Sequence, residues 1–84
     1  MGALEDQLQH QQRFQPGQTV RWNEDALVLS EMQEEVASMI ERTGRQFRIK
    51  DVQQTGCGLV FVIPDVPGCE NVLCYSLYLD IVLH

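Results

Sequence analysis

The sequence predicts an α+β domain in which one amphipathic helix packs on a small antiparallel sheet. Apolar residues between positions 29 and 40 recur at the spacing of a helix face, whereas several shorter segments alternate apolar and polar residues as strands do. Turn-forming Pro and Gly residues separate these segments. With 84 residues the chain suffices for one domain, and its predicted element order is one strand, the helix and then three strands (β-α-β-β-β).

Residues 1–15 are predicted to form a flexible, glutamine-rich tail, and residues 16–84 the folded domain. The tail contains five glutamines, and only Leu4 and Leu8 could begin an apolar stripe in it. A helix that forms on binding a partner is the alternative. The domain then opens with Pro16-Gly17, the residue order typical of a type II turn.

The helix is predicted to end at Thr43, because Gly44 supplies the left-handed residue that commonly follows a helix. Two start positions are consistent with the sequence. Ser30 and Gln33 fit a capping box, and Asn23 fits an earlier cap. The apolar face consists of Leu29, Met32, Val36, Met39 and Ile40.

Four segments are predicted strands: residues 19–22, 46–52, 59–63 and 73–83. In the second, the alternation shifts at Val52, which predicts a bulge near Asp51. Two prolines make residues 64–68 a loop. In the last strand one apolar face is predicted to pack on the helix, namely Leu73, Tyr75, Leu77, Leu79, Ile81 and Leu83.

Two spacings resemble the starts of strands in SH3-like small barrels. They are Phe14-x-x-Gly17-x-x-Val20 and Gly44-x-x-Phe47-x-Ile49-x-x-Val52. The resemblance implies a sheet that curves into a partial barrel. Because such barrels carry no helix of this length between their first strands, the helix would be an insertion. The resemblance concerns the fold alone.

Twelve acidic and six basic side chains give a formal net charge of −6. This balance disfavours nucleic-acid and anionic membrane partners, since both are bound through Lys and Arg. The longest apolar run, Leu59–Ile63, is too short to span a bilayer. Between positions 23 and 41 there are six acids and no base. Four bases follow, Arg42, Arg45, Arg48 and Lys50, and the binding of an acidic partner by this segment is one hypothesis.

Catalytic, metal-binding and cofactor-binding sites are not predicted. The three cysteines, Cys57, Cys69 and Cys74, lack the paired spacing of a metal site, and a thiol nucleophile needs a neighbouring base, usually histidine. Only His10 and His84 are present, near the two ends. The helix glutamates are interpreted as a solvated face that complements the helix dipole. The odd number of cysteines and the lack of an export signal predict a cytoplasmic location.

The second face of the sheet leads to the functional prediction. Residues 59–63 have no polar side, and the strand 73–83 leaves apolar residues on the face away from the helix, where small antiparallel sheets usually show polar ones. We predict a small non-enzymatic protein that acts through protein–protein contact, as a homo-oligomer or with another protein. The expected interface residues are Val60, Tyr78, Val82 and Trp22. Closure of the sheet into a barrel is the alternative use of this face.

A small-molecule-binding domain is the competing hypothesis. Its pocket would lie between helix and sheet and would be lined by Trp22, Met32 and Met39. Methionines at helical spacing are more typical of a core than of a ligand site.

Overall fold

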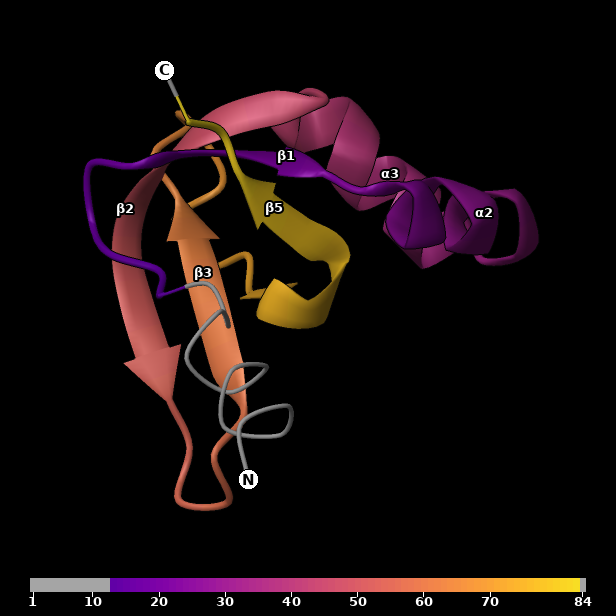
Figure 1. The fold of residues 1–84 in the computed structure, drawn as a ribbon. Coiled ribbons are helices and arrows are strands. Elements are labelled where there is room, and N and C mark those ends of the chain that lie inside the picture. Colours follow the sequence, from indigo (N-terminus) through magenta and orange to yellow (C-terminus); the bar gives the residue numbers. More distant parts are fainter. Residues whose placement is uncertain (1–12, 84) are drawn as a thin grey trace.

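The computed structural model describes residues 13–83, which form two helices and a five-stranded antiparallel sheet (Figure 1). The elements are β1 (Thr19–Trp22), α2 (Glu24–Met32), α3 (Glu34–Thr43), β2 (Gln46–Gln54), β3 (Val60–Pro64), β4 (Cys74–Tyr75), the 3-10 turn η1 (Ser76–Tyr78) and β5 (Leu79–Ile81). The predicted α+β class is confirmed. The predictions for His10, His84 and most of the tail lie outside the described residues, whereas Phe14 packs against the core.

Strand β2 joins the two halves of the sheet, whose strand order is β4-β3-β2-β1-β5. Its first part pairs with β1, which also pairs with β5, and its second part pairs with β3. The register shifts between Ile49 and Asp51, which confirms the predicted bulge. Such a bulge bends and twists the strand that carries it. The bend lets β2 pair with β1 at one end and with β3 at the other.

The prediction of one helix is wrong, because Gln33 separates two. Its backbone is extended, with φ −128° and ψ 116°. The predicted end at Thr43 is confirmed, because Gly44 follows α3 with φ 83°. Of the two starts that were left open, the structure has the one at Asn23, whose side chain accepts a hydrogen bond from the Ala26 N–H. The alternative start at Ser30 is wrong, since Ser30 lies inside α2.

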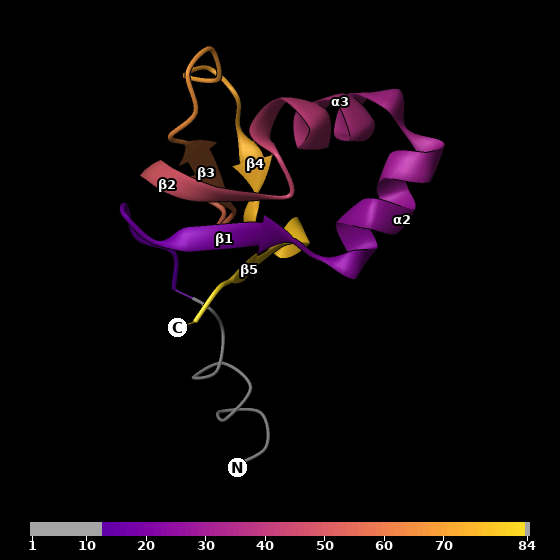
Figure 2. The same ribbon diagram turned by 90° about the horizontal axis from the view of Figure 1, so that it is seen from above.

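The break is explained by the fact that the two ends of the helical segment, residues 24–43, are held together, which we call its closure. The backbone N–H of Trp22, before α2, donates to the carbonyl oxygen of Arg45, after α3, at 2.9 Å. A straight helix of some twenty residues would hold its ends roughly 30 Å apart. Figure 2 shows how α3 instead turns back toward the strands.

The prediction of one last strand over residues 73–83 is also wrong. Strands β4 and β5 lie at opposite edges of the sheet, and η1 carries the chain between them. The predicted apolar row is therefore split. Leu79 is buried, but Leu73, Leu77 and Leu83 are exposed, and Cys74, which is not part of that row, is fully buried.

The buried core is one cluster to which all five strands and α2 contribute. Its members are Val20, Trp22, Ala26, Phe47, Ile49, Val62, Cys74 and Leu79. The Trp22 indole lies 6.0 Å from the Phe47 ring, measured between centroids, and its N–H donates to Thr43 Oγ1 at 2.9 Å. The Thr43 hydroxyl in turn donates to the Met39 carbonyl oxygen at 2.7 Å. Trp22 thus links β1 to β2 and to the end of α3.

Thr43→Val leaves the buried indole N–H of Trp22 without an acceptor. We expect it to lower the free energy of unfolding by about 1–3 kcal/mol, measured by urea denaturation followed by circular dichroism. In a Trp22→Phe background, where no indole N–H is present, the same substitution costs less. Equal costs in the two backgrounds would show that the bond contributes nothing to stability.

Candidate functional site

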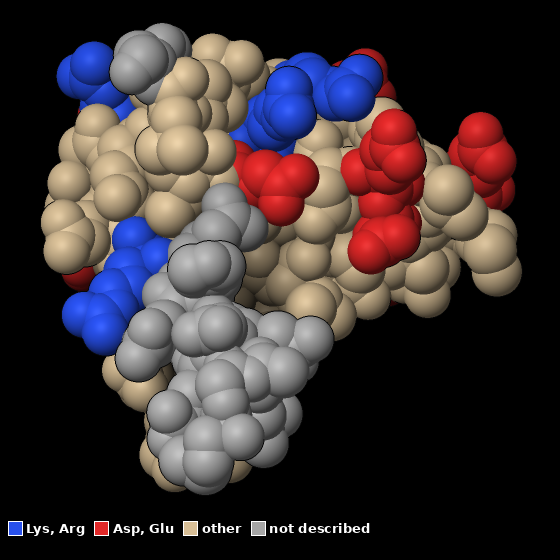
Figure 3. All heavy atoms as spheres, viewed as in Figure 1, with Lys and Arg blue, Asp and Glu red and all other residues tan. Residues whose placement is uncertain are grey.

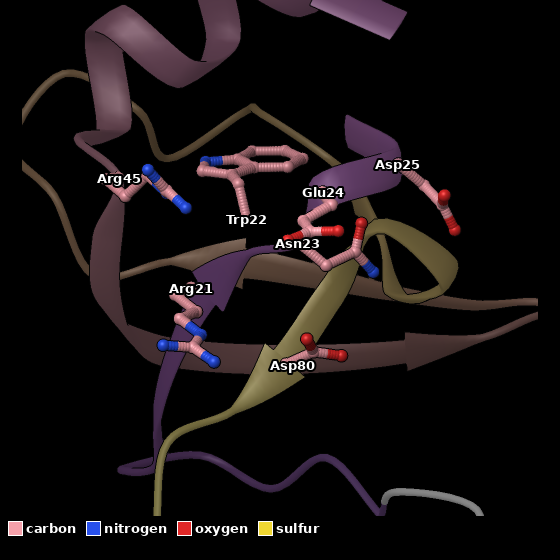
Figure 4. Close-up of a pocket in the computed structure, with 7 residues that line it drawn as sticks. All are labelled: Arg21, Trp22, Asn23, Glu24, Asp25, Arg45 and Asp80. Atoms are coloured by element: carbon pink, nitrogen blue, oxygen red, sulfur yellow. The ribbon is translucent and has the colours of Figure 1, made fainter. Parts of the chain in front are cut away.

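A polar hollow of about 550 Å³ lies where β1 meets α2. It is lined by Arg21, Trp22, Asn23, Glu24, Asp25, Arg45 and Asp80. Figure 4 shows the guanidinium groups of Arg21 and Arg45 toward one side of the hollow and the carboxylates of Glu24 and Asp25 toward the other. Because guanidinium groups donate hydrogen bonds and carboxylates accept them, this arrangement suits a small ligand that carries both charges.

Local backbone structure positions these side chains. Arg21 pairs across the strands with Asp80, and both alternate with core residues, so they point away from the core. Asn23 fixes the corner: its side chain caps α2, and its Nδ2 donates to the Leu77 carbonyl oxygen at 3.0 Å. The lining residues include no cysteine, serine or histidine. Its lining consists of charged and amide side chains together with the indole of Trp22.

Of the residues of the predicted pocket, Trp22, Met32 and Met39, no two line the same one of two hollows formed by the described residues. Trp22 is only 2% exposed and fills the space between sheet and helix. Met39 is half-buried and borders a second hollow, of about 710 Å³, on the surface of α3. Met32 lies at the end of α2, lines neither hollow and is 77% exposed.

The four predicted interface residues are also placed apart. Trp22 belongs to the core, which is a correction, because its indole is paired and packed inside the domain. Val60 lies two residues from buried Val62 and shares its side of β3. Val82 is half-buried and follows β5, and its N–H donates to the Thr19 carbonyl oxygen at 2.8 Å.

Tyr78, the remaining residue, joins a row of three aromatic rings that we call the outer aromatic row: Phe61, Tyr75 and Tyr78. Phe61 and Tyr75 pair across β3 and β4, with ring centroids 5.5 Å apart, and Tyr78 meets Tyr75 edge-on at 5.8 Å. Phe61 alternates with the fully buried Val62 and therefore faces away from it. All three side chains are half-buried.

Sequence reasoning missed Phe61 and Tyr75 for identifiable reasons. The wholly apolar run that contains Phe61 does not reveal which of its sides is the core side. Tyr75 was assigned to the helix-facing row because the turn at η1 was not expected. Sequence reasoning also missed that Val28 on α2 is exposed. The sequence does contain a signal for this exposure, because the apolar residues of α2 lie on all sides of the helix instead of forming one stripe.

The three cysteines are free thiols in different surroundings. Burial, together with the neighbouring Cys69, raises the pKa of the Cys74 thiol to about 12. Cys57 is exposed in the connection between β2 and β3, where Thr55 Oγ1 lies 3.2 Å from its sulfur, and this hydrogen bond lowers its pKa. The thiolate, which is the reactive form, is therefore favoured at Cys57 and disfavoured at Cys74.

Within residues 13–83, no group of three or more His, Cys, Asp or Glu side chains is placed to hold a metal ion. In the same range, no helix combines the length and apolar character needed to cross a bilayer. Comparisons with protein-family models, curated proteins and solved structures find no match to the chain.

The thiol surroundings predict one fast and two protected cysteines. In the native protein at pH 8, Ellman's reagent should modify Cys57 rapidly, at a rate that rises with pH as its thiolate forms. Cys69 and Cys74 should react only after unfolding in guanidinium chloride. Cys57→Ser, the matched variant, should lack the fast phase. More than one fast thiol in the native protein would contradict the burial of Cys69 and Cys74.

Proposed function

We propose that this chain is a small non-enzymatic protein-interaction domain that self-associates through the outer aromatic row. The carrying observation is the row itself, three half-buried rings of which Phe61 turns away from the core. Tyrosine and phenylalanine are enriched in protein interfaces, where they bury much apolar area with few freely rotating bonds. A second copy is the proposed occupant because matching aromatic rows can pack on each other around a twofold axis.

We further propose that the sheet curves into an SH3-like partial barrel. The strand order, the single core shared by all five strands and the 3-10 turn before β5 support this arrangement. In such a barrel α2 and α3 form the insertion between the first two strands. The core would lie inside the curve and the Phe61 and Tyr75 rings on its outside, whereas Tyr78, which also packs against the core, would form the inner end of the row. The three free thiols support a reducing, cytoplasmic location.

Binding of a small zwitterion in the polar hollow is the second candidate function, favoured by the opposed Arg and carboxylate groups. Trp22 lines the hollow, so its fluorescence should change on titration with amino acids or short charged peptides. Arg45→Gln, which removes one guanidinium, should weaken the response several-fold, whereas Arg48→Gln on β2 should not. Unchanged fluorescence across the panel, together with no heat of binding in calorimetry, would count against this function.

Self-association is tested by light scattering behind a sizing column. We expect twice the monomer mass at micromolar concentration. Tyr75→Asp should give the monomer, since it places a charge in the apolar contact. Val28→Asp makes the same kind of change on α2 and should leave the dimer intact. Circular dichroism checks that both variants fold. A monomeric native protein at a few hundred micromolar would overturn the proposal.

A further inference from the structure

We propose that the exposed side of α2 docks a partner protein whose apolar groove is bordered by lysine and arginine side chains. The α2 face, as we call it, consists of Glu24, Asp25, Val28, Glu31 and Met32. This inference concerns a different surface from the outer aromatic row and does not depend on self-association.

Helical spacing places two apolar side chains at the centre of this face. Val28 and Met32 lie one turn apart, on the side of α2 opposite the fully buried Ala26. They are 59% and 77% exposed. The helix stands at the end of the molecule, farther from the strands than α3 (Figure 2). An apolar pair so far from the core contributes little to folding and is available for contact.

Acidic side chains flank the apolar pair on both sides. From the same spacing, Glu24 and Glu31 lie along one flank and Asp25 along the other, and all three are exposed. Figure 3 shows acidic side chains gathered over the helices, with a further acidic group over the strands, whereas the visible Lys and Arg side chains lie over the strands, including the start of β2. The face therefore combines an apolar centre with a negative border.

This charge pattern selects the kind of partner. A second copy docking through the same face would bring two negative borders together, which costs free energy. Anionic membranes and nucleic acids meet the same repulsion. A groove bordered by Lys or Arg is instead attracted at long range and fits both parts of the face, as in helix-in-groove recognition.

The helix is already formed before docking. Asn23 caps its start with Oδ1, which accepts the Ala26 N–H at 3.0 Å, and its Nδ2 bonds the helix to η1 through Leu77. On another side α2 packs against α3. A preformed helix loses little conformational entropy on binding, so even a small face can support a transient contact.

The experiment uses the full chain and a labelled 14-residue amphipathic peptide with leucine along one face and lysine on both flanks. Fluorescence anisotropy should give a dissociation constant in the micromolar range, and this constant should rise as salt is added because salt screens the charges. The same peptide with glutamate in place of lysine should not bind. Val28→Ala combined with Met32→Ala keeps the helix and the charges, and should weaken binding roughly tenfold.

A pair of charge variants separates local recognition from attraction to the net charge. One combines Glu24→Gln, Asp25→Asn and Glu31→Gln on the α2 face. The other combines Asp51→Asn, Asp65→Asn and Glu70→Gln, three exposed acids outside the helices. Each raises the net charge by three, but only the first should weaken binding by roughly tenfold or more.

Equal loss in the two charge variants, or no effect of the alanine substitutions, would overturn the proposal. So would a dissociation constant above about 1 mM for the native chain, the range of nonspecific encounters. The oligomeric mass of the same samples is read separately by light scattering. A dimer that fails to bind the peptide removes only this inference, and a monomer that binds it removes only the proposed self-association.

Discussion

The paired and buried Trp22 closes the helical segment, and the rest of the fold depends on this closure. Its backbone N–H bonds Arg45 across the mouth of the segment, and its indole N–H bonds Thr43 at the end of α3. The start of α2 and the end of α3 are thereby held next to one another. With the ends fixed, β2 starts beside β1, the chain must reverse within the helical segment, and the break at Gln33 provides that reversal.

The same closure decides where binding surfaces can be. The buried indole packs into the core between the sheet and the helices, and neither of the two hollows is lined by both Trp22 and a methionine. The three candidate surfaces therefore lie outside the core. They are the polar hollow at the corner of β1 and α2, the outer aromatic row and the α2 face.

Features set by neighbouring residues could be predicted from the sequence. The cap at Asn23, the positive φ of Gly44 and the bulge before Asp51 each depend on a few residues in a row. The two errors, at Gln33 and in the last strand, have another origin. Both turns exist because distant strands must meet, one to join β2 to β1 and the other to carry β5 to the far edge of the sheet. The periodicity of neighbouring residues does not show which distant strands pair. A long helix with short connections to two paired strands does, however, imply that the chain reverses within it.

For a related reason, the sequence predicts that the sheet has an apolar second side but not which residues lie on it. That the sheet has an apolar second side follows from the polar-free run 59–63, but the side that faces inward depends on pairing with β2. There Val52 pairs with Val62, which places Val62 in the core and turns Phe61 outward. A one-residue change of register would exchange the two sides. For this reason the sequence predicts Val60 as an interface residue, whereas in the structure Phe61 occupies the outward side of β3.

The corner at Asn23 connects two of these surfaces. Its backbone N–H donates to the Tyr78 carbonyl oxygen at 3.0 Å, and its side chain bonds both Leu77 and the first turn of α2. Tyr78 carries one end of the outer aromatic row, and α2 carries the acidic apolar face. Because these three bonds tie backbone groups of η1 and α2 to the one residue Asn23, moving either surface relative to the other would break hydrogen bonds at Asn23. The two surfaces therefore share one rigid frame, and a partner at either meets a shape that folding has already fixed.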